Sequence, residues 1–336
     1  MSDKAPWVTY RPELKVLDCT IRDGGLVNNS NFSDEFVRAV YDTCIQAGID
    51  YMEIGYKNSP RLFPASDYGP WRRCDEEDMR RVVGDHDSVA TGLKLTAMAD
   101  AGKSDWKTQI IPAKDSVLDT IRVACYVHQI PEAVDMIQHA HELGYEATVN
   151  LMAISIVQEV EVRQALEVFA ETPATTIVVV DSFGALYREQ VDNLVTLYLS
   201  MIEGTGKHVG IHAHNNQQLA FANTIEAIIL GANRADASMA GIGRGAGNCS
   251  MELLIGFLRN PKFKLRPILQ LLQDEMLKLR EEIEWGPSVP YNLTGQLNRH
   301  PREAIKVREG SDPDNYVDFY DQQTRDIEAK DLLLID

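Results

Sequence analysis

Two histidines separated by a single residue are the clearest sign of chemistry in this sequence. They lie in the segment GIHAHNN (210–216), at the end of a predicted strand. Residues two apart on a strand point to the same side, so His212 and His214 can bind one metal ion together. One buried, hydrogen-bonded histidine beside an exposed one is the alternative for an isolated pair. The position at a strand end, just before Asn215 and Asn216, favours the metal.

A second segment, DCTIRDGG (18–25), places Arg22 and Asp23 directly after another predicted strand. By itself it would indicate an Asp-Gly turn with a nearby salt bridge. If this strand lies near the histidine strand, Asp23 adds one carboxylate to two imidazoles. Such a set leaves coordination positions open and is typical of a catalytic metal site. Arg22 would then present its guanidinium to a developing enolate oxygen or to a carboxylate.

A glycine-rich segment, GIGRGAGN (241–248), follows the last predicted strand. Its glycines permit either a tight turn or a close approach of the backbone to a ligand. Backbone amides around Gly243 and Gly245 could bind an anionic group of a substrate. The side chain of Asn248 could reach the metal directly or through a water molecule. A dinucleotide-binding loop would follow the first strand of a βαβ unit instead.

Other ionisable residues at predicted strand ends are candidates for the same site. Glu53 either faces the metal or forms an ion pair with the neighbouring arginine. Asp181 either contacts substrate or caps the following helix. His128 is a candidate acid–base residue because it follows the fourth predicted strand. Lys57 and Lys94 would allow Schiff-base chemistry, which the paired histidines disfavour.

Eight predicted strands alternate with amphipathic segments, which indicates an α/β fold of the (β/α)₈ TIM-barrel type. A doubly wound sheet is the runner-up. In a closed barrel the first strand lies beside the eighth, and the seventh lies just beyond, so Asp23 and both histidines meet at one rim. The predicted strands span 15–20, 50–56, 90–99, 120–127, 146–155, 175–182, 208–214 and 234–241. The predicted helices span 33–47, 131–143, 157–171, 187–203, 216–230 and 249–259, with weaker signals at 75–83 and 112–118.

The pattern divides the 336 residues into three parts. An N-terminal extension spans 1–13, the barrel spans 14–262, and a C-terminal helical extension spans 263–336. The extension opens with a helical stretch over 265–285, whose apolar residues share one face. That face packs either on the chain's own barrel or on a second subunit.

Composition excludes several classes of function. The net charge of −17 argues against nucleic-acid binding, which needs clustered lysine and arginine. No apolar run approaches the length of a membrane span, and the N-terminus has no secretory h-region. Five scattered cysteines without a C-x-x-C motif indicate a reducing cytoplasm.

Taken together, LDCTIRDGG, IHAHNN and GIGRGAGN resemble the metal-dependent aldolases and lyases called DRE-TIM metallolyases. Hydroxymethylglutaryl-CoA lyase belongs to that superfamily. The stretch LTGQLNRHPREAI (293–305) is similar to the C-terminal region of 4-hydroxy-2-oxovalerate aldolase. The resemblance implies cleavage of a 4-hydroxy-2-oxo acid into an aldehyde and a 2-oxo acid such as pyruvate, through a metal-bound enolate.

Carried over to matching positions, the resemblance makes Arg22 the residue that stabilises the enolate, and it places Tyr291 near a tyrosine that reaches into the aldolase site. The metal ligands it implies are Asp23, His212 and His214, with Asn248 as a fourth or indirect ligand. One departure matters: the aldolase has a histidine base shortly after R-D-G, and here the nearby position is Leu26. His128 is the candidate replacement.

The metal is expected to be Mn²⁺, with Mg²⁺, Co²⁺ or Zn²⁺ as alternatives, because two histidines and a carboxylate suit several ions. A homo-oligomer is expected, and the aldolase resemblance adds an aldehyde dehydrogenase as a second partner. Two other functions stay open. One is Claisen-type transfer of an acetyl group from acetyl-CoA onto a 2-oxo acid. The other is a non-catalytic metal-binding sensor that has lost the base.

Overall fold

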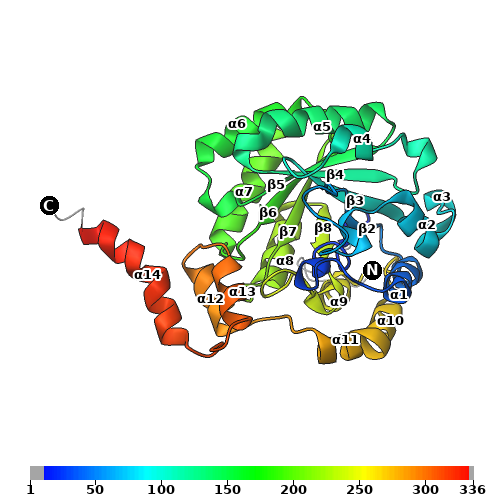
Figure 1. The fold of residues 1–336 in the computed structure, drawn as a ribbon. Coiled ribbons are helices and arrows are strands. Elements are labelled where there is room, and N and C mark those ends of the chain that lie inside the picture. The colour runs from blue at the N-terminus through cyan, green and yellow to red at the C-terminus, as the bar shows by residue number, and fades with distance from the viewer. Residues whose placement is uncertain (1–10, 333–336) are drawn as a thin grey trace, which may run out of the picture.

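The computed structural model describes the backbone of residues 11–332 and the side chains of residues 11–325. Eight parallel strands form a closed barrel in chain order, with helices around the outside (Figure 1). The predicted TIM barrel is therefore confirmed. Its strands are β1 (Lys15–Asp18), β2 (Tyr51–Tyr56), β3 (Lys94–Asp100), β4 (Thr120–Cys125), β5 (Glu146–Leu151), β6 (Thr176–Asp181), β7 (His208–Ala213) and β8 (Arg234–Ala237).

The strands form where runs of apolar, β-branched residues can be buried on both faces. Every residue of β4 and β6 is buried. β8 pairs with both β1 and β7, and this closure brings the ends of β1 and β7 to the same part of the rim. β3 begins at Lys94 rather than at residue 90, because Ser88–Thr91 form the short helix α3. The Asp87 side chain caps that helix.

Most of the predicted helices are present. In α1 the Ser33 hydroxyl accepts a hydrogen bond from the Phe36 amide, and Gly48 ends the helix with a φ of +73°. The predicted helix over 112–118 is wrong: only a 3₁₀ turn forms, and the backbone is extended again at Ser116. The helices of the barrel are α1 (Asp34–Ala47), α2 (Glu76–Val83), α4 (Trp106–Gln109), α5 (Ile130–Glu142), α6 (Glu159–Ala170), α7 (Arg188–Met201), α8 (Ala220–Leu230) and α9 (Met251–Leu258).

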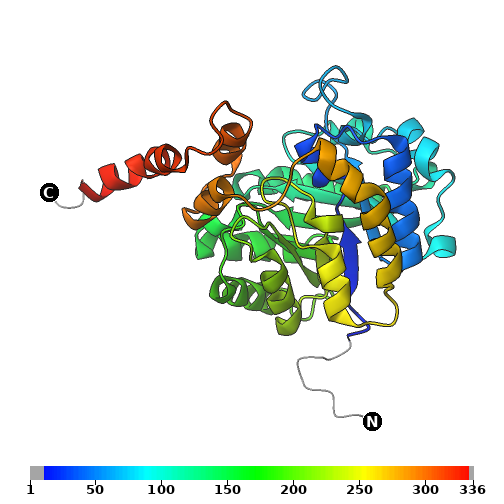
Figure 2. The same ribbon diagram turned by 90° about the horizontal axis from the view of Figure 1, so that it is seen from below.

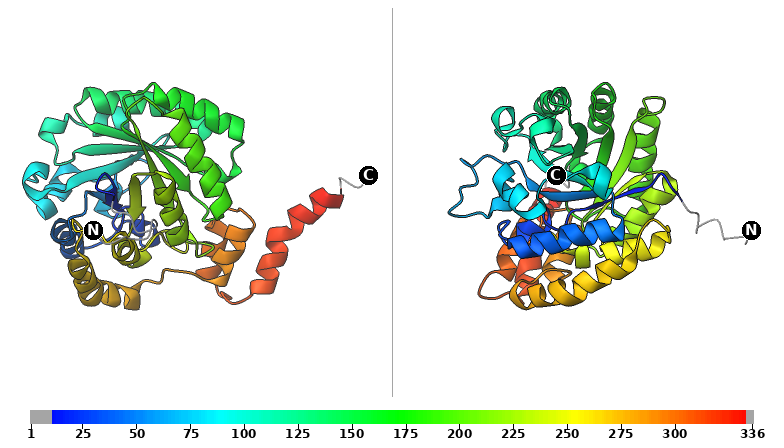
Figure 3. Two further views of the ribbon diagram at one scale, coloured as in Figure 1. Left: turned by 180° about the vertical axis from the view of Figure 1, so that it is seen from behind. Right: turned by 90° about the vertical axis from the view of Figure 1, so that its right-hand side faces the viewer.

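The C-terminal region begins with α10 (Leu265–Leu271), a π-helical turn and α11 (Leu277–Glu282), where a continuous helical stretch was predicted. This helical segment lies along α1 on the outside of the barrel (Figure 3). Ile268, Leu271 and Met276 are buried in the main core. The apolar face of the stretch therefore packs against the chain's own barrel.

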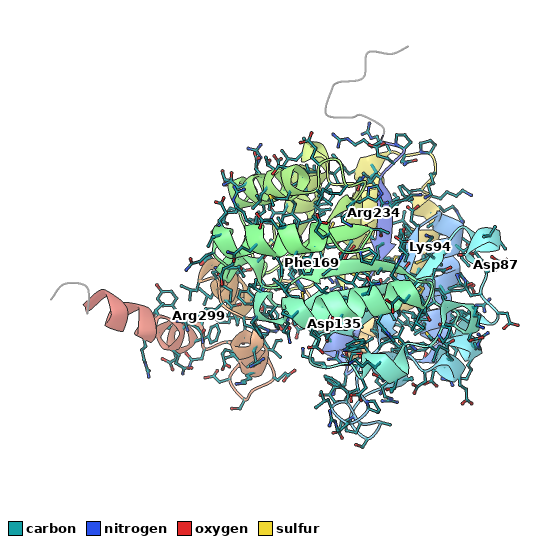
Figure 4. All side chains as sticks on the ribbon, turned by 90° about the horizontal axis from the view of Figure 1, so that it is seen from above. Asp87, Lys94, Asp135, Phe169, Arg234 and Arg299 are labelled. Atoms are coloured by element: carbon teal, nitrogen blue, oxygen red, sulfur yellow. The ribbon has the colours of Figure 1, made fainter. Side chains whose placement is uncertain are left out.

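Two short helices, α12 (Val289–Gln296) and α13 (Arg302–Arg308), lie at one end of the barrel. In Figure 2, β1 runs toward that end, where the loop after β2 also projects. α14 (Tyr316–Leu332) extends away from the barrel, beyond the labelled Arg299 in Figure 4. Between residues 11 and 332 no helix has the length and apolarity to cross a membrane.

Candidate active site

Asp23, His212 and His214 meet at the carboxyl ends of β1 and β7, as predicted. Their candidate ligand atoms all lie within 4.8 Å of one another, and all three side chains are buried. The Nε2 atoms of both histidines have no hydrogen-bond partner within the described part of the chain. Two buried, unsatisfied imidazole nitrogens beside a carboxylate are a donor set that fits a divalent metal ion.

The opposite nitrogen of each imidazole fixes how the ring is turned. His212 Nδ1 lies 3.0 Å from Asp236 Oδ2, and His214 Nδ1 lies 3.0 Å from the backbone oxygen of Asp181. Nδ1–H donates in both contacts, which leaves the Nε2 lone pairs directed at the site. Burial lowers the pKa of His214 to about 4, so this ring is neutral and able to bind a metal at neutral pH.

Three neighbours donate hydrogen bonds to the Asp23 carboxylate, one of them the Arg244 amide at 3.3 Å from Oδ2. Arg22 Nη1 donates to Oδ1 at 2.6 Å, and Asn248 Nδ2 donates to Oδ2 at 2.7 Å. Burial would raise the pKa of Asp23, but Arg22 and His214 outweigh it and keep the pKa well below its usual range. Gly243 is required here, because a Cβ atom would lie 2.2 Å from Asn248 Nδ2 and 2.6 Å from Asp23 Oδ2.

A buried charge network continues from this carboxylate into the barrel. Arg22 Nε donates to Glu53 Oε2 at 2.6 Å, and Arg122 Nη1 reaches the same oxygen at 3.2 Å. Arg122 Nη2 donates at 2.6 Å to Asp236, the carboxylate that holds His212. Glu53 is fully buried and forms ion pairs with two arginines. Its role in the structure is therefore to orient Arg22.

A cavity of about 250 Å³ opens over the three candidate ligands. One wall is apolar and consists of Leu26, Tyr56, Met98, Ala124 and Met152. The ionisable side chains that line the rest, apart from those of the metal site, are Arg72, Asp100, Lys103, Tyr126, Arg244, His300 and Arg302. Leu26 therefore lies in an apolar wall at the position where the aldolase resemblance expects a base.

Several predicted site residues lie outside this cavity. The Asp181 carboxylate accepts hydrogen bonds from the amides of Ala185 and Leu186 in the turn before α7, and the N-cap of that helix is Tyr187, so Asp181 does not cap it. The His128 ring stacks on Tyr126, with ring centroids 5.7 Å apart, and Tyr126 lines the cavity instead. Tyr291 lines a neighbouring cavity together with Gly245 and Arg308.

The described residues that complete the cavity include several that sequence reasoning missed. His300 is the chief one, and it comes from the turn between α12 and α13. Burial and the nearby Arg244 and Arg302 lower its pKa to about 4. The only sequence signal was the C-terminal stretch NRHPRE, which contains both His300 and Arg302. Arg72 lies in the loop after β2, which carries no motif.

Comparisons with known proteins find similar enzymes. A 4-hydroxy-2-oxovalerate aldolase of Rhodococcus jostii is 30% identical over 246 residues, which cover 73% of this chain and 70% of that protein. An oxaloacetate decarboxylase of Mycobacterium tuberculosis is 29% identical over 252 residues, which cover 75% of this chain and 71% of that protein. The N-terminal domain of a putative aldolase from Bacteroides vulgatus superposes with a TM-score of 0.74 at 27% identity, covering 88% of this chain and 97% of that domain.

A more distant structure shares the fold. The HMG-CoA lyase of Brucella melitensis has a TM-score of 0.64 at 16% identity, covering 80% of this chain and 99% of that protein. The HMGL-like family model matches residues 13–274, which is most of the chain. This protein therefore belongs to the HMGL-like family, the DRE-TIM lyases and aldolases whose motifs its sequence resembles.

Proposed function

We propose that this protein is a divalent-metal-dependent lyase that cleaves a carbon–carbon bond of a 2-oxo acid. The observation that carries the proposal is the pair of buried, unsatisfied Nε2 atoms beside the Asp23 carboxylate, with Arg22 in contact with that carboxylate. With a 4-hydroxy-2-oxo acid as substrate, the products are an aldehyde and a 2-oxo acid such as pyruvate. The relatives named 4-hydroxy-2-oxovalerate aldolase support this reaction.

The metal would be held by Asp23, His212 and His214, and we propose Mn²⁺ as the ion. When bound, such an ion acts as a Lewis acid toward the keto oxygen of a 2-oxo acid. Asn248 positions Asp23 through its amide nitrogen, and its buried Oδ1 has no partner among the described residues. That oxygen is available as a further ligand, directly or through water.

Arg22 supports the negative charge that develops on the substrate. Its Nε and Nη1 are held by Glu53 and Asp23, while the buried Nη2 has no hydrogen-bond partner within residues 11–325. The guanidinium is therefore fixed in place with one donor free. A preorganised donor of this kind stabilises an enolate oxygen without having to reorient during the reaction.

His300 is the proposed hydrogen-bond donor to the 4-oxygen of an aldol substrate. It lines the cavity, and its low pKa keeps it neutral at pH 7. Its Nδ1 accepts from the Arg302 amide at 3.1 Å, so the Nε2 of the neutral ring carries the proton. That N–H can donate a hydrogen bond to an oxygen of the substrate. His128 lies outside the cavity and is not needed for this role.

Decarboxylation is a second candidate reaction. Loss of carbon dioxide from a 2-oxo dicarboxylic acid gives the same kind of enolate but requires no base for a 4-hydroxyl group. Leu26 and its apolar neighbours stand where the resemblance expects that base. The Mycobacterium tuberculosis relative is named oxaloacetate decarboxylase.

Deuterium exchange tests the shared chemistry of both reactions. The Mn²⁺-loaded protein is incubated with pyruvate in D₂O, and mass spectrometry follows deuterium at the methyl carbon, since exchange there requires the enolate. We expect exchange that depends on metal and is lost in the double variant His212→Ala, His214→Ala. His141→Ala, an exposed histidine on α5, is the matched control.

Metal analysis and incubation with further substrates separate the alternative functions. Full metal occupancy in the double variant would refute the assigned ligands. Labelled acetyl-CoA that condenses with a 2-oxo acid, without exchange into pyruvate, would support the Claisen alternative. A metal-loaded protein that is inert with 2-oxo acids, 4-hydroxy-2-oxo acids and acetyl-CoA would support the sensor.

A further inference from the structure

Arg72 is a buried cation, and the side chains that the structure describes include no counter-charge for it. It ends the 3₁₀ turn η3 (Pro70–Arg72) in the loop after β2, and its side chain lines the cavity. Its guanidinium carbon lies 4.3 Å from the ring centroids of both Tyr56 and Phe63, while only 8% of the residue is exposed. Throughout residues 11–325 no carboxylate pairs with it, and Nε is buried without a hydrogen-bond acceptor.

This arrangement differs from that of the other buried arginines near the site. Arg22 and Arg122 each contact two carboxylates. A buried charge is unfavourable unless it is paired and hydrogen-bonded, and two aromatic rings compensate for this only in part. The rings also hold the guanidinium in a fixed place. Arg72 therefore has the properties of a preorganised donor for an anion that enters the cavity.

The rest of the cavity has the same excess of positive charge. Of its two carboxylates, Asp100 forms an ion pair with Lys103, with Oδ2 3.8 Å from Nζ, and Asp23 belongs to the metal site. The guanidiniums of Arg244 and Arg302 have no carboxylate partner in the described part of the chain, although the whole protein carries a net charge of −17. The positive charge of this cavity is thus a local feature.

In one of the two neutral tautomers of His300, two donors face each other in the cavity. The Arg302 amide donates to Nδ1 of His300, which leaves the proton of the neutral ring on Nε2. That Nε2 lies 3.3 Å from Nη1 of Arg244, so two donors face each other. An anionic oxygen placed between them would accept from both.

We propose that the cavity contains a second anion site, centred on Arg72, and that the substrate is a 2-oxo acid with a second acidic group remote from its 2-oxo acid end. This inference rests on the proposed function, which assigns the 2-oxo acid end to the metal and Arg22. Arg22 and Arg72 are both close to the Tyr56 ring: their guanidinium carbons lie 5.9 Å and 4.3 Å from its centroid. One substrate molecule can therefore contact both arginines. The second group is a carboxylate or a phosphoryl group, since both accept from a guanidinium.

A matched pair of ligands tests the site. Isothermal titration calorimetry on the Mn²⁺-loaded protein compares 2-oxopentanoate with 2-oxoglutarate, which have five carbons each and differ at the remote end. We expect 2-oxoglutarate to bind about tenfold more tightly or better, as for hydrogen bonds to charged groups. 2-Oxo-4-phosphonobutanoate, in which a phosphonate replaces the remote carboxylate of 2-oxoglutarate, is the third ligand, and tighter binding of it than of 2-oxoglutarate identifies the remote group as phosphoryl.

Variants assign the preference to Arg72. In Arg72→Met we expect the two five-carbon ligands to bind equally, with the affinity for 2-oxopentanoate unchanged. Arg163→Met on the outer helix α6 removes the same charge and should keep the preference. Equal binding by the wild-type protein would overturn the proposal without any variant. A preference that persists in folded Arg72→Met would also overturn it.

The same titrations keep this inference distinct from the proposed function. If 2-oxopentanoate binds only in the presence of metal and 2-oxoglutarate binds no better, the second anion site fails and the proposed metal site stands. If neither acid binds in a metal-dependent manner, both proposals fail.

Discussion

Replacing Asp236 by asparagine should weaken metal binding although Asp236 is not a ligand. Its Oδ2 lies 3.0 Å from His212 Nδ1 and 2.6 Å from Arg122 Nη2. Asparagine keeps the size of the side chain but has one acceptor oxygen and no charge. Both donors reach the same oxygen, so the asparagine oxygen can still accept from both, but without the negative charge that strengthens these two hydrogen bonds.

The size of the effect follows from this contact. Loss of a carboxylate behind a metal-binding histidine reduces metal affinity about 10–100-fold, which is about 1.4–2.7 kcal/mol. The free energy of unfolding should also fall, because Arg122 then retains only Glu53 at 3.2 Å. Breaking a buried ion pair costs about 3–5 kcal/mol, and the remaining pair keeps the loss toward the lower value.

Competition with a metal-sensitive chelator measures the Mn²⁺ affinity, and urea denaturation measures the stability of the metal-free protein. Glu146→Gln is the control, because it removes an ion pair with Lys94 at 2.6 Å at the opposite end of the barrel. The control should lose stability without losing metal affinity. A folded Asp236→Asn protein that binds Mn²⁺ as tightly as the wild type would refute the role of Asp236.

Three further predictions follow from other parts of the structure. Arg22→Lys should keep the metal but lower turnover about 10²–10³-fold, because lysine cannot hold Asp23 and Glu53 while keeping a donor free; turnover near that of the wild type would contradict this. Truncation after residue 262 should abolish activity and lower the melting temperature, since it uncovers α1 and removes His300; a folded, fully active barrel would contradict it. Burial raises the pKa of Asp18 from 3.8 to about 7, so its contribution to stability is complete below pH 4 and is lost as the pH rises through 7. Asp18→Asn should flatten the stability profile across that range, and an unchanged urea-denaturation profile would count against it.

The fold was largely predictable because its strands are buried on both faces and read as apolar runs. β4 and β6 are buried along their whole length. Closure of the barrel then determines which strand ends meet, so Asp23 and the two histidines could be placed together from their strand positions alone. The start of β3 could not be predicted, since the Asp87 cap turns Ser88–Thr91 into a helix.

The part of the cavity that Arg72 and His300 line was not predictable from the sequence. Arg72 and His300 lie in irregular segments, where no periodicity shows which way a side chain points. Their positions depend on how the loop after β2 and the turn before α13 pack over the rim. For His128 the position after a strand was a misleading signal, because its ring stacks on the outer side of the cavity residue Tyr126 rather than lining the cavity itself. An oligomer, a dehydrogenase partner and a cytoplasmic location stay predictions.

The balance of buried charge connects the metal site to the choice of substrate. Three carboxylates, those of Asp23, Glu53 and Asp236, meet the two guanidiniums of Arg22 and Arg122, and the histidines between them bind metal as neutral rings. This network has a net charge of −1. A divalent ion changes it to +1, and the carboxylate of one 2-oxo acid neutralises it. A second acidic group on the substrate would then need its own cation within the cavity. Arg72, buried and without a carboxylate in the described chain, supplies it.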